Sequence, residues 1–142
     1  MSVKQISVFL ENRPGSLREM TRTLADAGID MRAFSLAETS DFGIARLIVD
    51  DVFKTTTTLR DAGFIHSVSS VLAVAIPDVP GGLNRVLEVL GEEQVNVEYM
   101  YAFLGGAAHA YMIFRVADEP SAIRALAGAG IRLVEQEELS EL

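Results

Sequence analysis

Asn12-Arg13-Pro14-Gly15-Ser16-Leu17 recurs 66 positions later as Asp78-Val79-Pro80-Gly81-Gly82-Leu83. After a slip of one residue, Ala62-Gly63-Phe64 aligns in the same way with Ala129-Gly130-Ile131. Apolar positions between these stretches align as well, so the match covers strand, loop, helix and further strands in the same order. An ordered match of this length indicates an internal duplication.

The duplication divides the chain into two units and a tail. We expect the units at residues 1–69 and 70–136, followed by an acidic tail at 137–142. No stretch rich in Pro, Gly or Ser separates the two units. The join is therefore short, and we expect the units to pack together rather than to swing freely.

Each unit has the periodicity of a strand, a helix, two strands, a second helix and a final strand. In the first unit the expected elements are strand 6–10, helix 17–27, strand 29–38, strand 43–49, helix 51–62 and strand 64–69. In the second they are strand 71–76, helix 83–90, strands 95–103 and 109–116 around a turn at Gly105-Gly106, a helix opened by residues 118–121, and strand 130–134.

This βαββαβ order predicts an α+β fold of the ferredoxin-like type, repeated in tandem. Each unit then holds an antiparallel four-stranded sheet with both helices on one face. Right-handed crossovers place the first and third strands centrally and leave the second and fourth at the edges. Two such units can pair edge to edge, which removes an exposed strand edge from each.

Composition and charge exclude several classes of function. The 142 residues carry 12 Lys and Arg against 20 Asp and Glu, a formal net charge of −8. Nucleic acids and anionic membranes are bound by clustered positive charge, so we expect neither partner. The sequence contains no Cys, which excludes disulfides and thiolate chemistry. The longest apolar run, 71–76, is far shorter than the ~20 residues of a membrane span, and we expect a soluble, cytoplasmic protein.

The duplicated loop, in its position between first strand and first helix, resembles the ACT domain family. The motif D/N-x-P-G-x-L is followed by Gly28-Ile29-Asp30 in one unit and by Gln94-Val95-Asn96 in the other. ACT domains are regulatory modules that bind small ligands, usually amino acids, and are fused to enzymes of amino-acid metabolism or act on them in trans. The resemblance covers essentially the whole chain and implies a stand-alone ACT pair.

The residue types of the loop suit a ligand that carries a carboxylate. A helix start offers unpaired backbone N–H groups and the positive end of the helix dipole, both of which favour an anion. Gly15 and Gly81 let a ligand approach the backbone closely, because they have no Cβ atom. Asn12 and Asp78 either cap the helix or accept a hydrogen bond from the ammonium group of a ligand.

In ACT pairs, the resemblance implies, the ligand lies between the loop of one unit and the second strand of the other. That arrangement places residues 12–17 opposite 96–101, and residues 78–83 opposite 30–35. The residues expected to bind the ligand are Asn12, Arg13, Pro14, Gly15, Ser16, Leu17, Asn96, Tyr99 and Tyr101 at the first site, and Asp78, Pro80, Gly81, Gly82, Leu83, Asp30 and Ser35 at the second. We expect the first site to be the better formed, because an arginine can form a forked pair with a carboxylate.

Each of these features also has a purely structural interpretation. A Pro-Gly pair after a strand commonly forms only a turn, and Arg13 and Arg32 can pair with surface carboxylates. The tyrosines can pack on the sheet or at a subunit interface. The two histidines, His66 and His109, stand in different units, so we expect no metal site and no other cofactor.

The expected function is that of a non-catalytic sensor, which binds an amino acid and reports it to a partner enzyme of amino-acid metabolism. The sequence contains no G-x-S-x-G, H-E-x-x-H or P-loop motif. The alternative is a structural or assembly subunit that acts on such an enzyme without a ligand of its own. A small enzyme without a known motif is the third interpretation. The remaining edge strands favour a homodimer.

Overall fold

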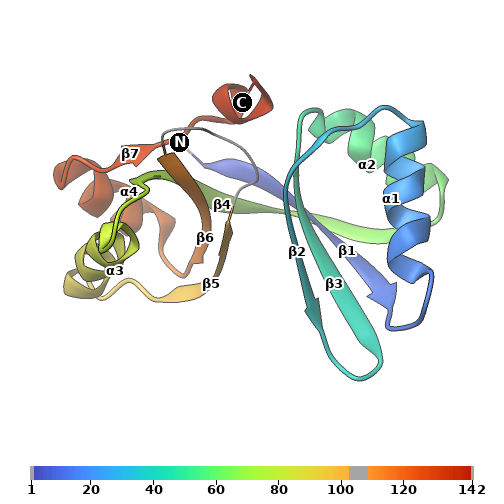
Figure 1. Ribbon diagram of the computed structural model, residues 1–142, viewed down its shortest axis with the longest axis horizontal. Helices are drawn as coiled ribbons and strands as arrows, with labels where there is room; N and C mark the ends of the chain where they lie inside the picture. The colour runs from blue at the N-terminus through green and yellow to red at the C-terminus, as the bar shows by residue number, and fades with distance from the viewer. Residues whose placement is uncertain (1, 103–108, 142) are drawn as a thin grey trace. The chain divides into compact units, whose positions relative to one another are not determined.

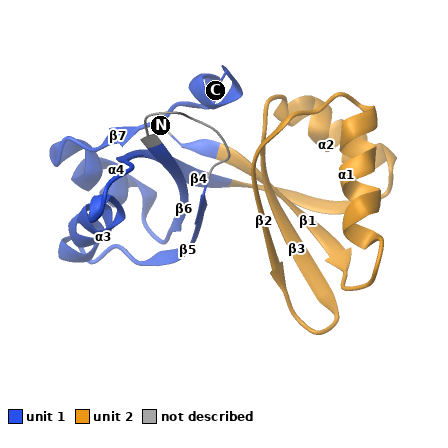
Figure 2. Ribbon diagram, viewed as in Figure 1, with its two compact units in different colours: residues 1–3, 70–142 blue, residues 4–69 orange. Residues whose placement is uncertain are grey.

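The computed structural model describes residues 2–102 and 109–141. Its helices and strands are shown in Figure 1. The chain divides into two compact units, residues 4–69 and residues 1–3 with 70–142. We call them the N-terminal unit and the C-terminal unit; they are orange and blue, respectively, in Figure 2.

The N-terminal unit contains a four-stranded sheet covered on one face by two helices (Figure 1). Its elements are β1 (Val3–Glu11), α1 (Ser16–Asp26), β2 (Met31–Glu38), β3 (Phe42–Val49), α2 (Val52–Asp61) and the first part of β4 (Ile65–Pro77). The strand order is β2-β3-β1-β4, and β3 pairs antiparallel with both β1 and β2. Apolar residues that alternate along β1, such as Ile6 and Val8, pack with Met20 and Leu24 of α1 to form the core.

The C-terminal unit repeats this arrangement. It contains the rest of β4, then α3 (Gly82–Glu92), β5 (Val97–Ala102), β6 (His109–Val116), α4 (Glu119–Gly128), β7 (Arg132–Leu133) and α5 (Gln136–Glu141). Here β4 lies between β7 and β6, and β5 is the neighbour of β6. Both units therefore have their first and third strands in the centre, which confirms the predicted tandem ferredoxin-like fold. Leu72, Val86, Leu90 and Phe114 belong to the core of this unit.

One difference from the expected elements is that strands 64–69 and 71–76 are a single strand. β4 is 13 residues long and contributes residues 65–69 to one unit and 70–77 to the other. No Gly or Pro interrupts it before Pro77, and its β-branched residues favour extended backbone. The serines at the unit boundary are hydrogen-bonded: Ser69 Oγ accepts from Gln5, and Ser70 Oγ donates to Glu119.

A second difference concerns the acidic tail. Residues 137–142 were expected as an acidic tail, and in the structure residues 136–141 form the short helix α5, in which Leu139 is fully buried. A side-chain ion pair between Glu138 and Arg132 also ties this helix to β7. One apolar residue thus docks an otherwise charged segment. The expected turn at Gly105-Gly106 lies outside the described residues.

Candidate ligand-binding site

The two Pro-Gly loops have the same backbone conformation. Gly15 (φ 87°) precedes α1 and Gly81 (φ 85°) precedes α3, both in the left-handed region that favours glycine. The backbone hydrogen bonds are duplicated too, because Ser16 N donates to the carbonyl of Arg13 and Gly82 N donates to that of Val79. The sequence repeat is therefore also a repeat of local geometry.

Neither α1 nor α3 has a side-chain cap. Asn12 instead donates from Nδ2 to the carbonyl oxygens of Thr39 and Ser40, at 3.0 and 3.4 Å, and so ties the loop to the turn between β2 and β3. The suggestion that Asn12 and Asp78 cap these helices was wrong. The N–H groups of Ser16 and Gly82 donate to backbone carbonyls, but no side chain accepts from the N–H groups that follow them, so each helix start keeps donors and the positive dipole end for an anion.

Arg13 is already paired within its own unit. Its Nε donates to Glu11 Oε2 at 2.9 Å, and its Nη2 lies 3.5 Å from Glu19 Oε2. The hydrogen bond to Glu11, helped by the charge of Glu19, raises the pKa of Arg13 above its ordinary value. This is the surface pairing given above as the alternative to ligand binding. A ligand carboxylate at Arg13 has to compete with two carboxylates, which weakens the argument that the first site is the better formed.

The two loops differ at one tightly packed position. Ser16 is buried in the N-terminal unit. At the equivalent Gly82, a Cβ atom would lie 2.4 Å from the carbonyl oxygen of Pro77 and 2.9 Å from Ile76 Cγ2. The start of α3 therefore approaches β4 so closely that only glycine fits there.

The second strands present some of their expected residues on the face of the sheet without helices. Phe34 and Met100 pack against the helix-side cores, so Ser35 on β2 and Tyr99 and Tyr101 on β5 point to the opposite face. Tyr101 is buried and Tyr99 half-buried.

Asp30 and Asn96 lie just before β2 and β5, and their carbonyl oxygens accept equivalent backbone hydrogen bonds, from Asp50 N and Ala117 N. The carboxylate of Asp30 pairs with Arg32 at 3.4 Å. The contacts described for each loop and each second strand are therefore formed within a single unit. The pairing of a loop with the second strand of the other unit stays a prediction.

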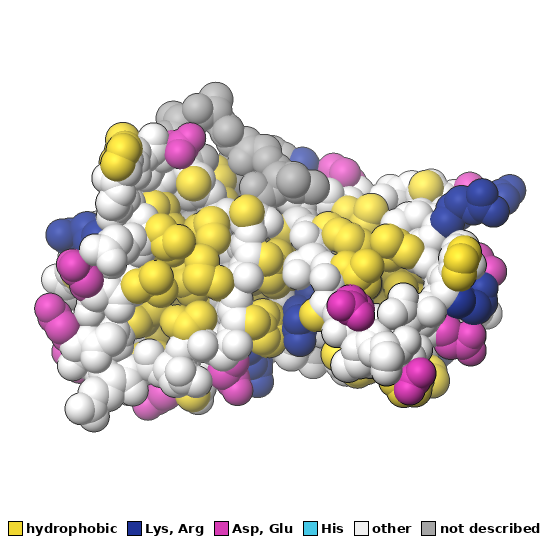
Figure 3. All heavy atoms as spheres, turned by 60° about the horizontal axis from the view of Figure 1, so that its bottom comes forward, with side chains coloured by type: hydrophobic (Ala, Val, Ile, Leu, Met, Phe, Trp, Pro, Cys, Tyr) yellow, Lys and Arg dark blue, Asp and Glu magenta, His cyan; other side chains and the backbone are white. Residues whose placement is uncertain are grey.

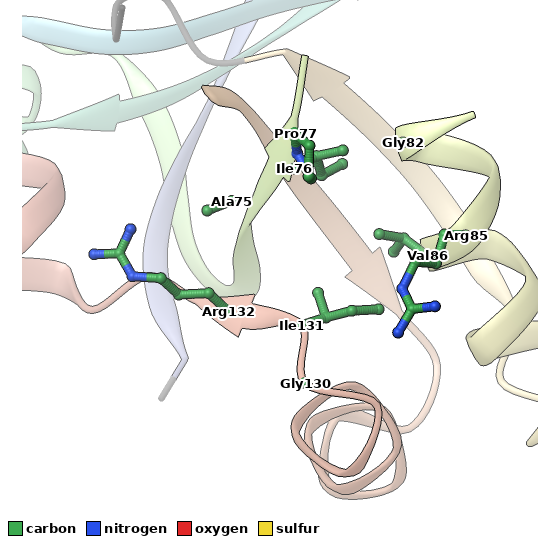
Figure 4. A pocket seen from close by; sticks show the side chains of 9 residues that line it. All are labelled: Ala75, Ile76, Pro77, Gly82, Arg85, Val86, Gly130, Ile131 and Arg132. Carbon is green, nitrogen blue, oxygen red and sulfur yellow. The ribbon is translucent and has the colours of Figure 1, made fainter. Parts of the chain in front are cut away.

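Each unit also has a cavity that the sequence analysis missed. The cavity of the N-terminal unit, about 430 Å³, lies between the end of β1, the start of α1 and residues 62–65. The cavity of the C-terminal unit, about 220 Å³, lies at the equivalent place, between the end of β4, the start of α3 and residues 130–132 (Figure 4). The signal was present in the alignment of residues 62–64 with 129–131, which places the same segment beside both loops.

The Pro-Gly loop, the strand order and the cavity occur in both units. The chain is therefore a tandem repeat of one structural module. The sequence pattern of the ACT domain pair family matches residues 1–142. This chain belongs to that family.

Solved structures of other proteins share the fold of this ACT domain pair. A protein from Bacteroides thetaiotaomicron is 37% identical, with a TM-score of 0.94, over 100% of this chain and 98% of that one. The regulatory subunit of aspartate kinase from Thermus thermophilus is 15% identical, with a TM-score of 0.64, over 89% of this chain and 91% of that one. At that identity the second likeness shows the fold alone. A comparison with curated proteins gives no match.

The described part of the ACT pair offers neither a cluster of metal ligands nor a membrane-spanning helix. Among residues 2–102 and 109–141, no group of three or more His, Asp or Glu side chains is placed to hold a metal ion. No helix in the same residues is long and apolar enough to cross a membrane. The described residues do offer backbone hydrogen-bond donors and the positive end of a helix dipole at the two helix starts that are capped by glycine.

Proposed function

We propose that this ACT domain pair is a non-catalytic regulatory protein that binds an amino acid at its Pro-Gly loops. The observation that carries the proposal is the duplicated helix start, capped by a left-handed glycine and by no side chain. Such a start can receive the α-carboxylate of an amino acid through backbone N–H groups. The open space around Gly15 and Gly81, where an added Cβ would meet no atom within 4 Å, leaves room for the ligand.

In this proposal the second strand of the opposite unit completes each site. Asn96, Tyr99 and Tyr101 would face the first loop, and Asp30 and Ser35 the second. A ligand that binds one arrangement of the units more tightly shifts the population toward it, and a partner enzyme of amino-acid metabolism senses that shift. The protein would act as a homodimer. The large hydrophobic side chains exposed on its surface, and the apolar patches visible in Figure 3, support an interface of that kind.

A thermal-shift screen with the twenty amino acids at millimolar concentration tests the proposal. Binding to the native state alone stabilises it by about 2.7 kcal/mol at a hundredfold excess over Kd, so one or two amino acids are expected to raise Tm selectively. Gly15→Asp and Gly81→Asp place a carboxylate where the ligand carboxylate would lie and are expected to reduce that shift.

Gly28→Asp is the matched control, because Gly28 also has a positive φ (72°) but follows α1 instead of preceding a helix. It brings the same backbone strain without changing a Pro-Gly loop and is expected to keep the ligand-induced shift. A flat screen would contradict the proposal and favour the assembly subunit. An equal loss in all three variants would show that strain, and not the loops, was responsible.

A further inference from the structure

One arginine side chain that lines the cavity of the C-terminal unit has no carboxylate partner among the described residues. Arg85, on α3, is one of its lining residues. Among the described residues, the only hydrogen bond of its side chain is from Nη2 to the carbonyl oxygen of Ala129, at 2.8 Å, and the guanidinium forms no ion pair. This bond anchors the guanidinium at the cavity and leaves its other N–H groups to solvent or a ligand.

The second arginine of the cavity has a different role. Arg132 lies on β7 and forms an ion pair with Glu138 of α5. In Figure 4 its side chain points away from that of Arg85, which reaches from α3 toward Ile131. Arg85 is therefore the group that can meet an anion directly.

The repeat supplies an internal comparison. The residue equivalent to Arg85 in the N-terminal unit is Glu19, and the residue equivalent to Pro77 is Glu11; both line the cavity there and both pair with Arg13. One unit thus has two carboxylates around a single guanidinium, whereas no acidic residue lines the described cavity of the other. Equivalent cavities are thus lined by side chains of opposite net charge, and the cavity of the C-terminal unit is basic although the protein has a net charge of −8.

The remaining walls restrict the ligand. Ile76, Val86 and Ile131 make most of the cavity apolar, and its volume of about 220 Å³ is below the roughly 300–1,000 Å³ of sites for drug-sized molecules. With no carboxylate in the described lining, an ammonium group would find no charged partner. We propose that this cavity binds a small aliphatic carboxylate, with Arg85 donating to the carboxylate and the aliphatic body packed on the three apolar side chains. This proposal does not depend on amino-acid binding at the Pro-Gly loops, although the cavity shares Gly82 with the second of them.

Titration of the full chain with 3-methylbutanoate, followed by calorimetry and by amide NMR shifts, tests the inference. We expect saturable binding, with the largest shifts at Gly82, Gly130 and Ile131. Arg85→Gln is expected to weaken binding about tenfold or more, because it removes a charge-assisted hydrogen bond. Glu19→Gln, at the equivalent position of the other unit, is the matched control and is expected to leave the affinity unchanged.

Three outcomes would overturn the inference: no saturable binding to the wild type, equal affinity in Arg85→Gln, or equal affinity for inorganic phosphate, which cannot use the apolar walls. The wild-type shift map is informative even if Arg85→Gln does not fold, because shifts confined to other residues also contradict the site. The amino-acid screen tests the first Pro-Gly loop separately, because that loop lies in the other unit. A selective amino acid whose thermal shift persists in Arg85→Gln would support the Pro-Gly sites whatever happens to 3-methylbutanoate.

Discussion

At position 82 the second copy of the loop motif requires glycine, whereas the first copy has a serine at the equivalent position. Gly82→Ala is expected to lower the free energy of unfolding by about 1–3 kcal/mol, because the new Cβ would lie 2.4 Å from a backbone oxygen of β4, which cannot move alone. Urea denaturation measures the change. The control is Gly91→Ala in the same helix, where an added Cβ meets nothing within 4 Å; it is expected to stabilise by about 0.5–1 kcal/mol. A destabilisation of the same size in both variants would contradict the steric explanation.

At the scale of elements, the second helix of each unit begins with a cap that the first helix lacks. Asp51 accepts from Lys54 N at 2.9 Å, and Asp118 accepts from Ser121 N at 3.1 Å and from Ser121 Oγ at 2.7 Å. The hydrogen bonds from Ser121, that of its side chain first, lower the pKa of Asp118 below its ordinary value. The Asp51 cap helps α2 form in spite of the β-branched run 55–58, whose helix propensity is poor.

The lowered pKa of Asp118 predicts a pH dependence. The ionised carboxylate stabilises the native state above the unfolded pKa, about 3.9, and that contribution is lost as the pH falls through the lower native value. Asn caps a helix equally well but does not titrate. Asp118→Asn is therefore expected to melt near the wild-type Tm at neutral pH and to lose less stability than the wild type on acidification from about pH 5 to pH 3. Identical Tm-against-pH curves would refute the assignment.

At the scale of the whole molecule, one strand belongs to both units. Because β4 contributes backbone to both sheets, we expect the two units to unfold in a single transition. Leu24→Ala and Leu90→Ala remove equivalent core side chains, 0% and 1% exposed, and each is expected to cost about 2–5 kcal/mol. All three tyrosines belong to the C-terminal unit, so tyrosine fluorescence follows that unit alone.

The decisive variant is Leu24→Ala, which alters only the N-terminal core. Coupled unfolding predicts that its tyrosine transition in urea moves to lower concentration together with the far-ultraviolet circular dichroism. A tyrosine transition that stays at the wild-type midpoint, while part of the dichroism is lost earlier, would show that the units unfold separately.

Much of the fold could be read from periodicity because it is local. Alternation along β1, helical spacing after Pro14 and the glycine at each helix start are properties of short segments. The duplication then placed those segments in one known topology. Strand ends were less predictable, since the sequence contains no residue that must interrupt β4 at position 70. The docking of α5 depends on the burial of Leu139, which no local pattern in a run of acidic residues reveals.

The sequence by itself determined the tandem βαββαβ order, the family and the position of the two Pro-Gly loops, since these depend on spacing and on the conformational freedom of single residues. Only the tertiary structure decided which partners the side chains take. In the structure Arg13 pairs with Glu11 and Glu19, Asn12 donates a hydrogen bond to the β2–β3 turn, and residues 130–132 line the same cavity as Arg85. The physical reason is that hydrogen bonds, ion pairs and cavities depend on distances between segments far apart in the chain, and those distances are set by how the strands and helices pack.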